Sequence, residues 1–440
     1  MPLPLVAFPE IVTKNVTRFE SIFKTVEQRK HFCEYVTGLI AGEKATVQAI
    51  NDLYLNKNDQ SSLNKFITQA KWDESALNRK RIELEMERLK RRPVSAAAGR
   101  LILDDTLAHH TRCAMEGLAY LYDHTVAHNV WCHNVVTSYY VNRSDQFPID
   151  FRLYLQFRQR VEQTKLQKQR RAYTEYPTEA SVRTYLLSLV SYHYRQRTFR
   201  TKTMLAAELV RQAIAYQIPF SVVLFDSWYL RWPLIAEIQH VHKDWIGAAP
   251  KDRKVLFNNR WLQLKEYIQT VPKEAYRPYR IGVHLYWAFT KVLPMKNLQG
   301  QKVRLVASYQ NAVNLEKLPN FYATNRKDWE PKRILTTYCD RWPTETFNED
   351  VKGHLGFEDY QLHRLHAIRR HWYLSFVAYS LLGDQAPPGH SRWQVKGRFE
   401  STGQRCKAVA DELLGALVHW IAHELQNGAD SELILQSLMA

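Results

Sequence analysis

Three acidic residues lie where the chain could gather them at one edge of a sheet. Asp105 and Asp226 each follow a short apolar run that predicts a buried strand with a carboxylate at its end. Glu345 lies near the start of a predicted helix, because Pro343 suits a first helical turn. Carboxylates gathered in this way bind Mg²⁺, and two such ions ~3.5–4 Å apart stabilise the entering and leaving oxygens of a phosphodiester displacement. The alternative is that these aspartates are turn or helix-cap residues.

Aromatic and basic residues accompany Glu345 at fixed spacings. Tyr338 and Arg341 precede it, and Lys352 follows it. On an α-helix, Arg341, Glu345 and Lys352 differ by four and seven positions, which places them on one face. Arginine suits a bidentate contact with phosphate and lysine a point contact, so this segment could hold a metal-binding carboxylate beside cations for the same substrate. The alternative is a salt-bridged helix face with a packed tyrosine.

The spacing Tyr-x2-Arg-x3-Glu-x6-Lys from Tyr338 to Lys352 resembles the signature of bacterial insertion-sequence transposases of the DDE class. The stretches 104–106 (Asp-Asp-Thr) and 225–229 (Phe-Asp-Ser-Trp-Tyr) resemble the first and second aspartate boxes of that family. More loosely, the resemblance extends over residues 19–382.

The first box contains two adjacent aspartates, of which only one is expected to bind metal. Neighbouring strand residues point to opposite faces of a sheet, so both cannot reach the same ion. The resemblance selects Asp105, because Thr106 follows it directly. Asp104 is then expected to be a supporting or solvent-facing acid.

The resemblance implies an α/β fold with an RNase H-like catalytic core and an activity of cut-and-paste transposition. Mg²⁺-dependent hydrolysis at the terminal inverted repeats would free the element, and the resulting 3′-hydroxyl would attack target DNA. Asp105, Asp226 and Glu345 would be the catalytic residues and the ligands of two Mg²⁺ ions, for which Mn²⁺ could substitute. The residues inferred to contact the transposon end are Tyr338, Arg341 and Lys352.

The resemblance also implies that the protein acts on double-stranded DNA, both transposon ends and target, as a homodimer. Independently, the formal net charge of +17 favours a polyanionic partner, because neutralised phosphates release counterions. Ordinary solvation of surface lysine and arginine is the alternative. The 5 cysteines are scattered and contain no Cys-x2-Cys pair, which is typical of reduced thiols. We therefore expect the protein in the cytoplasm, associated with the nucleoid.

A helix predicted from about residue 73 to residue 92 is dense in charge. Its residues Arg79, Lys80 and Arg81 would suit a helix lying against a phosphate backbone, although many charged helices are simply solvated. Pro93 ends the helical pattern. We expect this region to belong to an N-terminal helical unit that binds DNA and recognises the inverted repeats.

The order of helical and strand patterns divides the chain into five parts. Alternation over 283–289 and 303–307 predicts antiparallel strands, and thus a β-rich insertion ahead of the Glu345 helix. An amphipathic helix around 413–425 could cap the core or pair two subunits, and we favour capping. The expected parts are a helical DNA-binding domain (1–98), the first part of the catalytic core (99–250), the β-rich insertion (251–319), the second part of the core with the glutamate helix (320–385) and a C-terminal helical region (386–440).

Composition and motifs exclude several other classes of protein. A content of 45% hydrophobic and 12% aromatic residues rules out wholesale disorder, and no apolar stretch approaches the ~18–20 residues that span a bilayer. The histidines and cysteines at 109–133 lack zinc-binding spacing, and neither a Gly-x4-Gly-Lys-[Ser/Thr] phosphate loop nor a Gly-x-Ser-x-Gly serine elbow occurs. Trp287 could stack an extruded base, but its apolar neighbours favour a core position.

Two alternatives to an active transposase follow from the same residues. A catalytically inactive or domesticated relative would bind DNA without cutting it, although acids at all three positions argue against this. A related nuclease would cut DNA without joining it to a target.

Overall fold

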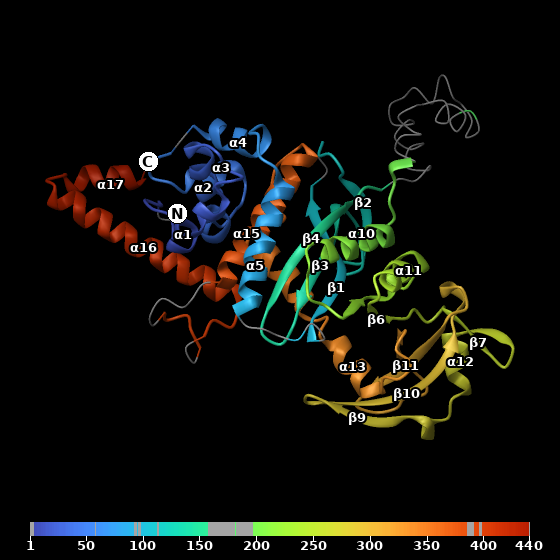
Figure 1. Cartoon of the computed structure of the whole chain (residues 1–440). Helices are drawn as coiled ribbons and strands as arrows, with labels where there is room; N and C mark the ends of the chain where they lie inside the picture. Colours follow the sequence, from blue (N-terminus) through green and yellow to red (C-terminus); the bar gives the residue numbers. More distant parts are fainter. Residues whose placement is uncertain are drawn as a thin grey trace.

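The protein is a mixed α/β structure in which helices from both ends of the chain flank one large sheet (Figure 1). The computed structural model describes residues 4–57, 59–91, 95, 98–111, 114–156, 181, 197–384, 391–395 and 398–439. No helix within these ranges is long and apolar enough to cross a membrane.

Ten strands form the main sheet, whose centre is mixed. They are β1 (Arg100–His110), β2 (Ala119–Asp123), β3 (His128–Val141), β4 (Gln146–Tyr154), β5 (Val222–Phe225), β6 (Asp244–Ala248), β9 (Arg277–Ile281), β10 (His284–Pro294), β11 (Lys302–Gln310) and β12 (Asn320–Thr324). The order is β2-β3-β1-β5-β6-β12-β11-β10-β9, and β4 also pairs with β3. β1 is antiparallel to β3 and parallel to β5, which is itself parallel to β6. A separate two-stranded sheet consists of β7 (Lys254–Phe257) and β8 (Arg260–Gln263).

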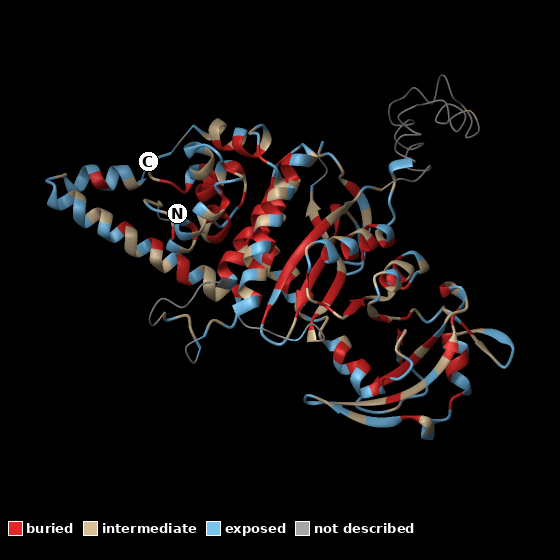
Figure 2. Ribbon diagram, viewed as in Figure 1, coloured by how far each residue is buried: buried red, intermediate tan, exposed pale blue. Residues whose placement is uncertain are grey.

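The central strands are buried on both faces, as the red strands in Figure 2 show. Ile102 and Leu224, which are paired in register, belong to one hydrophobic cluster. The next pair, Leu103 and Phe225, belongs to the other cluster. β1 and β5 therefore begin as continuous apolar runs because helices cover both sides of the sheet.

Two groups of helices cover the two faces. The cluster on one face includes α14, α15 and the N-terminal helices, and the cluster on the other includes α10 and α11. The helices are α1 (Glu10–Val16), α2 (Val26–Ala41), α3 (Val47–Asp52), α4 (Gln60–Thr68), α5 (Glu74–Arg91), α10 (Lys202–Ala215), α11 (Trp232–His240), α12 (Leu264–Tyr267), α13 (Pro331–Cys339), α14 (Pro343–His354), α15 (Leu365–Asp384), α16 (Thr402–Gln426) and α17 (Ser431–Met439).

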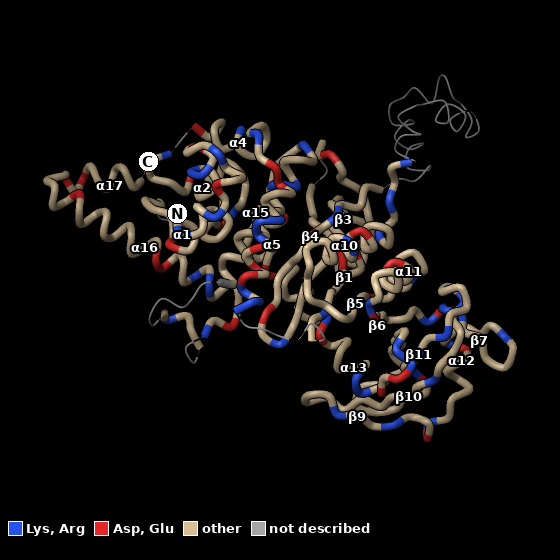
Figure 3. Tube along the Cα trace, in the orientation of Figure 1, with Lys and Arg blue, Asp and Glu red and all other residues tan. Residues whose placement is uncertain are grey.

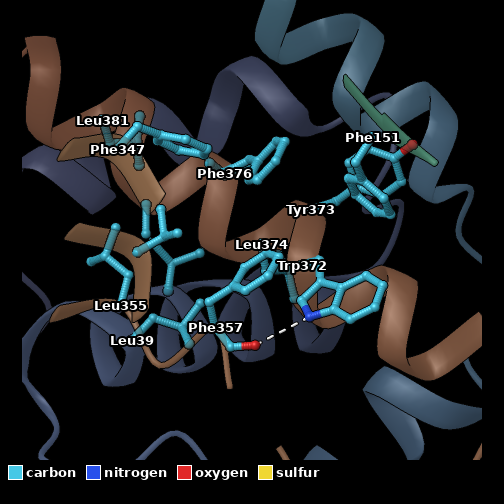
Figure 4. Packing of buried hydrophobic residues seen from close by; sticks show 14 of the residues in the cluster. Leu39, Phe151, Phe347, Leu355, Phe357, Trp372, Tyr373, Leu374, Phe376 and Leu381 are labelled. Atoms are coloured by element: carbon cyan, nitrogen blue, oxygen red, sulfur yellow. Dashed lines mark hydrogen bonds between the residues drawn. The ribbon is translucent and has the colours of Figure 1, made fainter. Parts of the chain in front are cut away.

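Helix α15 joins the two ends of the chain in one core (Figure 4). The ring of Trp372 stacks on Phe357 with centroids 5.3 Å apart, and its Nε1 donates to the Phe357 carbonyl at 3.1 Å. Tyr35 of α2 forms a hydrogen bond of 2.9 Å between its hydroxyl and His371 Nδ1. The N-terminal helices thus pack directly on α15, and the expected division into five domains stays a prediction.

Helix α16 caps this core with part of its length. Val409 and Leu413 are buried in the cluster that contains α15, whereas Val418 and Leu425 are exposed. The buried residues agree with the expectation that the helix caps the core.

The strands expected over 283–307 are present as β10 and β11, which pair antiparallel with Phe289 opposite Ala307. They do not form an independent sheet, because β12 pairs with both β11 and β6 and so continues the main sheet. Trp287 is partly buried and donates from Nε1 to the Asn311 carbonyl at 3.1 Å, as a packed residue would.

The expected DNA contact by Arg81 of α5 is wrong for this structure. Only 1% of Arg81 is exposed, and its guanidinium donates to the Asn78 side chain, the Ile149 carbonyl and the Ser380 hydroxyl. Burial lowers the pKa of this guanidinium from its ordinary value. Arg81 therefore ties α5 to β4 and α15, and it cannot reach a phosphate from this position.

Replacing Arg81 with alanine is expected to lower the free energy of unfolding by roughly 3 kcal/mol, because buried acceptors lose their donor and a cavity forms. Urea denaturation measures this change. Arg79→Ala, an exposed neighbour on the same helix, is the matched control and should change stability by less than about 0.5 kcal/mol. A stable Arg81→Ala protein would contradict the structural role.

Candidate active site

The end of β5 lies beside the middle of β1, where two adjacent aspartates occur. Leu103 pairs with Phe225, the last residue of β5, so Asp226 follows that strand directly. Asp104 and Asp105 lie within β1, which continues to His110 and does not end at an aspartate as expected. Two positions before Asp104, Ile102 packs in the cluster that includes α14. Because side chains alternate along a strand, Asp104 of β1 also faces α14.

A close approach of β6 to β5 fixes the position of Phe225, just before Asp226. A Cβ atom on Gly247 of β6 would lie 2.1 Å from a carbon of the Phe225 ring. Glycine is therefore required there, since any larger residue would displace the ring. Asp226 itself accepts a hydrogen bond from the Trp228 backbone at 3.0 Å and so caps a 3-10 turn, Ser227–Tyr229.

Helix α14 carries Glu345 on the face of the sheet to which Asp104 points. Phe347 holds the helix on the sheet, with its ring 4.9 Å from that of Tyr139 on β3. Arg341 donates from Nη1 to Asp104 Oδ2 at 3.0 Å and from Nη2 to Glu345. One guanidinium therefore bridges a carboxylate from β1 and a carboxylate from α14.

Arg341 itself lies outside α14, in the turn between α13 and α14. The expectation that Arg341, Glu345 and Lys352 share one continuous helix is thus only partly met. Glu345 and Lys352 lie on α14, and Arg341 reaches the same site from the turn that precedes it.

Asp105 points to the opposite face of the sheet. Its carboxylate is 2.7 Å from Lys202 Nζ at the start of α10, and it accepts hydrogen bonds from the Tyr229 hydroxyl at 2.8 Å and from Asn134 at 3.0 Å. Its cross-strand partner Val136 belongs to the cluster that includes α10. Arg341 links Asp104 to Glu345, whereas the charge of Asp105 acts on Asp226, and the expectation that Asp105 is the metal ligand stays a prediction.

The two aspartates of this site are electrostatically strained. Burial raises the pKa of Asp104 to about 7; Arg341 opposes this shift, while Asp105 and Asp226 add to it. Burial, followed by the charge of Asp105, also raises the pKa of Asp226. The charge of Arg341 therefore does not offset the effect of burial on these two carboxylates.

The donor set suits a hard divalent cation, because carboxylate oxygens are the ligands that Mg²⁺ prefers. In the described part of the chain, no three His, Cys, Asp or Glu side chains lie close enough to hold a metal ion as placed. The Arg341 guanidinium takes the place of a cation between Asp104 and Glu345. If Arg341 moved onto a phosphate, both carboxylates would be free to act as ligands together with Asp226.

Tyr338 and Lys352 contact the same two strands. The Tyr338 hydroxyl donates to the carbonyl of Phe225 at 3.4 Å, directly before Asp226, and burial raises the pKa of this tyrosine. Lys352 donates to the carbonyl of Leu107 on β1 at 2.6 Å and pairs with Glu358. These side chains therefore lie on either side of the aspartates along the sheet edge.

The other expected residues lie away from this edge. Arg79 on α5 is exposed, and Lys80 pairs with Glu83 at 3.0 Å in a partly exposed ion pair. Lysines and arginines occur along the whole described chain (Figure 3). The histidines at 109–133 are used in hydrogen bonds, among them His109 with Asp123 and His133 with Tyr360.

Sequence reasoning missed the group around Asp105. Lys202, Tyr229 and Asn134 come from three distant segments, and no spacing in the chain connects them. Trp228 was noted only as part of the second aspartate box, although its exposure beside Asp226 is unusual for so large an apolar residue.

Comparison with known families gives two matches. Residues 18–270 match the family described as DDE superfamily endonuclease, which spans more than half of the chain. Residues 187–381 match the family described as transposase DDE domain. The first match contains Asp104 and Asp226, and the second contains Asp226 and Glu345. No curated protein matches the chain.

In metal-free protein, Asp104→Asn is expected to raise stability at pH 8 and to have little effect near pH 4. The folded pKa of about 7 exceeds the ordinary 3.8, so the folded chain holds an extra proton between these values and native stability falls as pH rises through them. Because asparagine does not ionise, the variant avoids this loss of native stability, which is at most roughly 4 kcal/mol.

Urea denaturation in EDTA across this pH range measures the effect. Asp105→Asn is the matched control and should lower stability at pH 8, because Lys202 loses its ion-pair partner. The free energies of unfolding of Asp104→Asn and the native protein could instead differ by the same amount at every pH. That result would contradict the electrostatic strain at Asp104.

Proposed function

The chain belongs to the DDE superfamily of endonucleases and transposases, and we propose that it is a cut-and-paste transposase of an insertion sequence. It would cleave DNA at the terminal inverted repeats of its element and join the freed ends to target DNA. What supports this proposal is the Arg341 guanidinium, an exchangeable cation that bridges Asp104 and Glu345 near the end of β5, which Asp226 follows.

The topology of the central strands supports an RNase H-like catalytic core. The strand order β4-β3-β1-β5-β6 is antiparallel on one side of β1 and parallel on the other. Because the end of β5 lies beside the middle of β1, this order brings carboxylates from distant segments near one another.

We assign the metal ligands to Asp104, Asp226 and Glu345. When bound there, Mg²⁺, or Mn²⁺ in its place, would supply Lewis-acid stabilisation of the charge that develops on the phosphate. Asp105 would instead support the edge from the opposite face, through Lys202 and Tyr229.

The basic residues of the site would position the DNA strand. Arg341 would leave the carboxylates for a bidentate contact with a phosphate, which frees Asp104 and Glu345 as ligands. Tyr338 and Lys352, which lie on either side of the aspartates, would fix the strand along the sheet edge.

Two displacements at phosphorus would then follow. In the first, a water oxygen bonds to the phosphorus at the element end and the P–O3′ bond breaks, which leaves a 3′-hydroxyl. In the second, that hydroxyl bonds to a target phosphorus and displaces the target 3′-oxygen. Each step exchanges one phosphorus–oxygen bond for another, so strand joining needs no nucleotide cofactor.

We further propose that a homodimer acts on double-stranded DNA at the nucleoid, in the cytoplasm. The formal net charge of +17 supports binding to a polyanion. The N-terminal helices would recognise the inverted repeats. On α5, Arg79 and Lys80 would contact the DNA, whereas Arg81 is buried and would not.

Asp104→Asn, Asp226→Asn and Glu345→Gln are each expected to lower Mg²⁺-dependent cleavage by at least about 10³-fold, because several kcal/mol of charge stabilisation is lost. Asp105→Asn should lower it by no more than about tenfold, since that residue only supports the site. Cleavage of duplexes that carry the inverted repeats bracketing the gene measures these rates, and gel-shift assays in Ca²⁺ check that binding is kept.

A strand-transfer assay with pre-cleaved ends separates the alternatives. An active transposase yields joined product, a plain nuclease cuts without joining, and an inactive descendant binds without either product. Loss of cleavage in Asp105→Asn with full activity in Asp104→Asn would reverse the assignment of the ligand.

Arg341→Gln is expected to strengthen Mg²⁺ binding about tenfold in the absence of DNA, because the competing guanidinium is gone, and to weaken binding of element ends. The shift of the melting temperature with Mg²⁺ concentration measures the first effect. Arg100→Gln is the matched control, since Arg100 lies on β1, the strand that carries Asp104, but pairs with Asp340. Equal Mg²⁺ responses in native and Arg341→Gln proteins would contradict competition for the acids.

A further inference from the structure

The β4 groove, a cavity of about 450 Å³, lies along that strand and is lined by residues of α5, α10 and α15 as well (Figure 1). Its walls include Arg79 of α5, Arg152 of β4 and Arg369 of α15. Asp150 is the one acid among the described residues that line it. The three arginines come from distant segments of the chain, so the fold gathers positive charge here that no sequence spacing predicts.

The β4 groove is separate from the proposed metal site. In the sheet β3 lies between β4 and β1, so β4 is about 10 Å from the strand that carries Asp104. Phosphates along one DNA strand are about 3.4 Å apart in the direction of the axis, so this separation corresponds to roughly three nucleotides. A ligand in the groove therefore does not compete with a metal ion.

The acid of the groove is already used within the protein. Only 3% of Asp150 is exposed, and its carboxylate accepts from the Tyr373 hydroxyl at 2.8 Å and from Arg152 Nη1 at 2.9 Å. A longer contact of 3.8 Å joins Arg152 Nε to Glu208, whose carboxylate also faces Arg200 at 3.5 Å. Asp150 therefore orients Arg152 and does not neutralise the other arginines of the groove.

Those other arginines keep most of their charge. Arg79 is exposed, and no carboxylate within the described ranges pairs with it. The carboxylate of Glu74 lies 3.6 Å from Arg369 and 3.8 Å from Arg370, so two guanidiniums share one acid at long range. The side chain of Arg369 is 41% exposed. Arg79 and Arg369 are therefore available to an anion that enters the groove.

We propose that the β4 groove binds the sugar–phosphate backbone of double-stranded DNA, with the guanidiniums of Arg79, Arg152 and Arg369 on its phosphates. A planar guanidinium meets phosphate oxygens through two parallel hydrogen bonds, which suits arginines held on helices and strands. Contacts of this kind position DNA without reading its sequence. The inference rests on the proposed function, since it assigns the groove to the substrate of the metal site.

The test measures binding of a random-sequence duplex in Ca²⁺ over a series of salt concentrations. Arg79→Gln and Arg369→Gln are each expected to weaken binding about fivefold and to reduce the slope of log K against log salt by about 0.9, because each loses one phosphate contact. The double variant should reduce the slope by about 1.8. Arg152 is left unchanged, since its loss would leave Asp150 without its ion-pair partner.

Arg392→Gln is the matched control. Arg392 is also exposed, but it pairs with Asp411 and does not line the groove. This variant should keep the native affinity and the native salt slope. With saturating DNA, Arg79→Gln and Arg369→Gln should keep the native kcat of Mg²⁺-dependent cleavage and show a raised KM, because the groove holds DNA away from the metal site.

Native salt slopes in Arg79→Gln and Arg369→Gln would overturn the groove as a DNA site. A groove that takes only a free phosphate group would also overturn it. In that case inorganic phosphate raises the melting temperature of the native protein and not of the double variant, while both bind the duplex equally.

The outcomes for the groove and for the proposed function are distinguishable. Native salt slopes in the variants of a protein that cuts and joins DNA would leave the proposed function intact. A native protein that binds the duplex, and whose variants show the expected loss, could instead fail to cut or join DNA. That result would overturn the proposed function while the groove stands.

Discussion

Burial of carboxylates at a single sheet edge is the constraint on which this site depends. Asp104 in β1 and Asp226 after β5 are buried where little water can screen them, and Arg341 links Asp104 to Glu345 on α14. Like charges in such surroundings repel strongly, so the arrangement is stable only with a cation among them. Arg341 supplies that cation in the protein alone. The repulsion between these carboxylates destabilises the metal-free protein, and for the same reason it favours binding of a divalent ion.

The surrounding fold keeps these charges in place. The parallel pairing of β1 and β5 aligns the two aspartates, and Gly247 lets the Phe225 ring lie close against β6. Phe347 packs α14 on the same face, so the glutamate helix cannot move away without exposing apolar surface. Hydrophobic packing therefore holds together acids that electrostatics would separate.

The sequence identifies Asp226, Glu345 and their basic neighbours, because these lie at strand and helix ends with regular spacing. It does not decide between Asp104 and Asp105. The residues before them are apolar on both faces of β1. The alternation of side chains therefore predicts that Asp104 and Asp105 point to opposite faces of the sheet. It does not predict which of these faces α14 covers. Only the register with β5 and the packing of α14 settle that question, and both are contacts between distant segments.

Arg81 illustrates the same limit in a helix. Its neighbours Arg79 and Lys80 give the segment the look of a solvated basic face, yet Leu77 and Glu85, one turn away on either side, are buried with it. The helical repeat that relates Arg81 to these buried residues places its side chain inward, whereas its charge favours a position at the surface. Which tendency prevails depends on acceptors such as the Ile149 carbonyl, which lies far away in the chain.

The edge of the sheet is also asymmetric in charge. On the face covered by α14, Asp104 is buried beside Arg341, whereas near α10 Lys202 and Arg231 each lie 5.5 Å from the exposed indole of Trp228. A strand of DNA that crosses this edge would meet cations and an exposed indole on one side and a metal site on the other. Because Asp104 and Asp105 are consecutive residues of β1, a shift of this strand by one residue would exchange the two environments. The register of a single strand pair therefore determines both halves of the site.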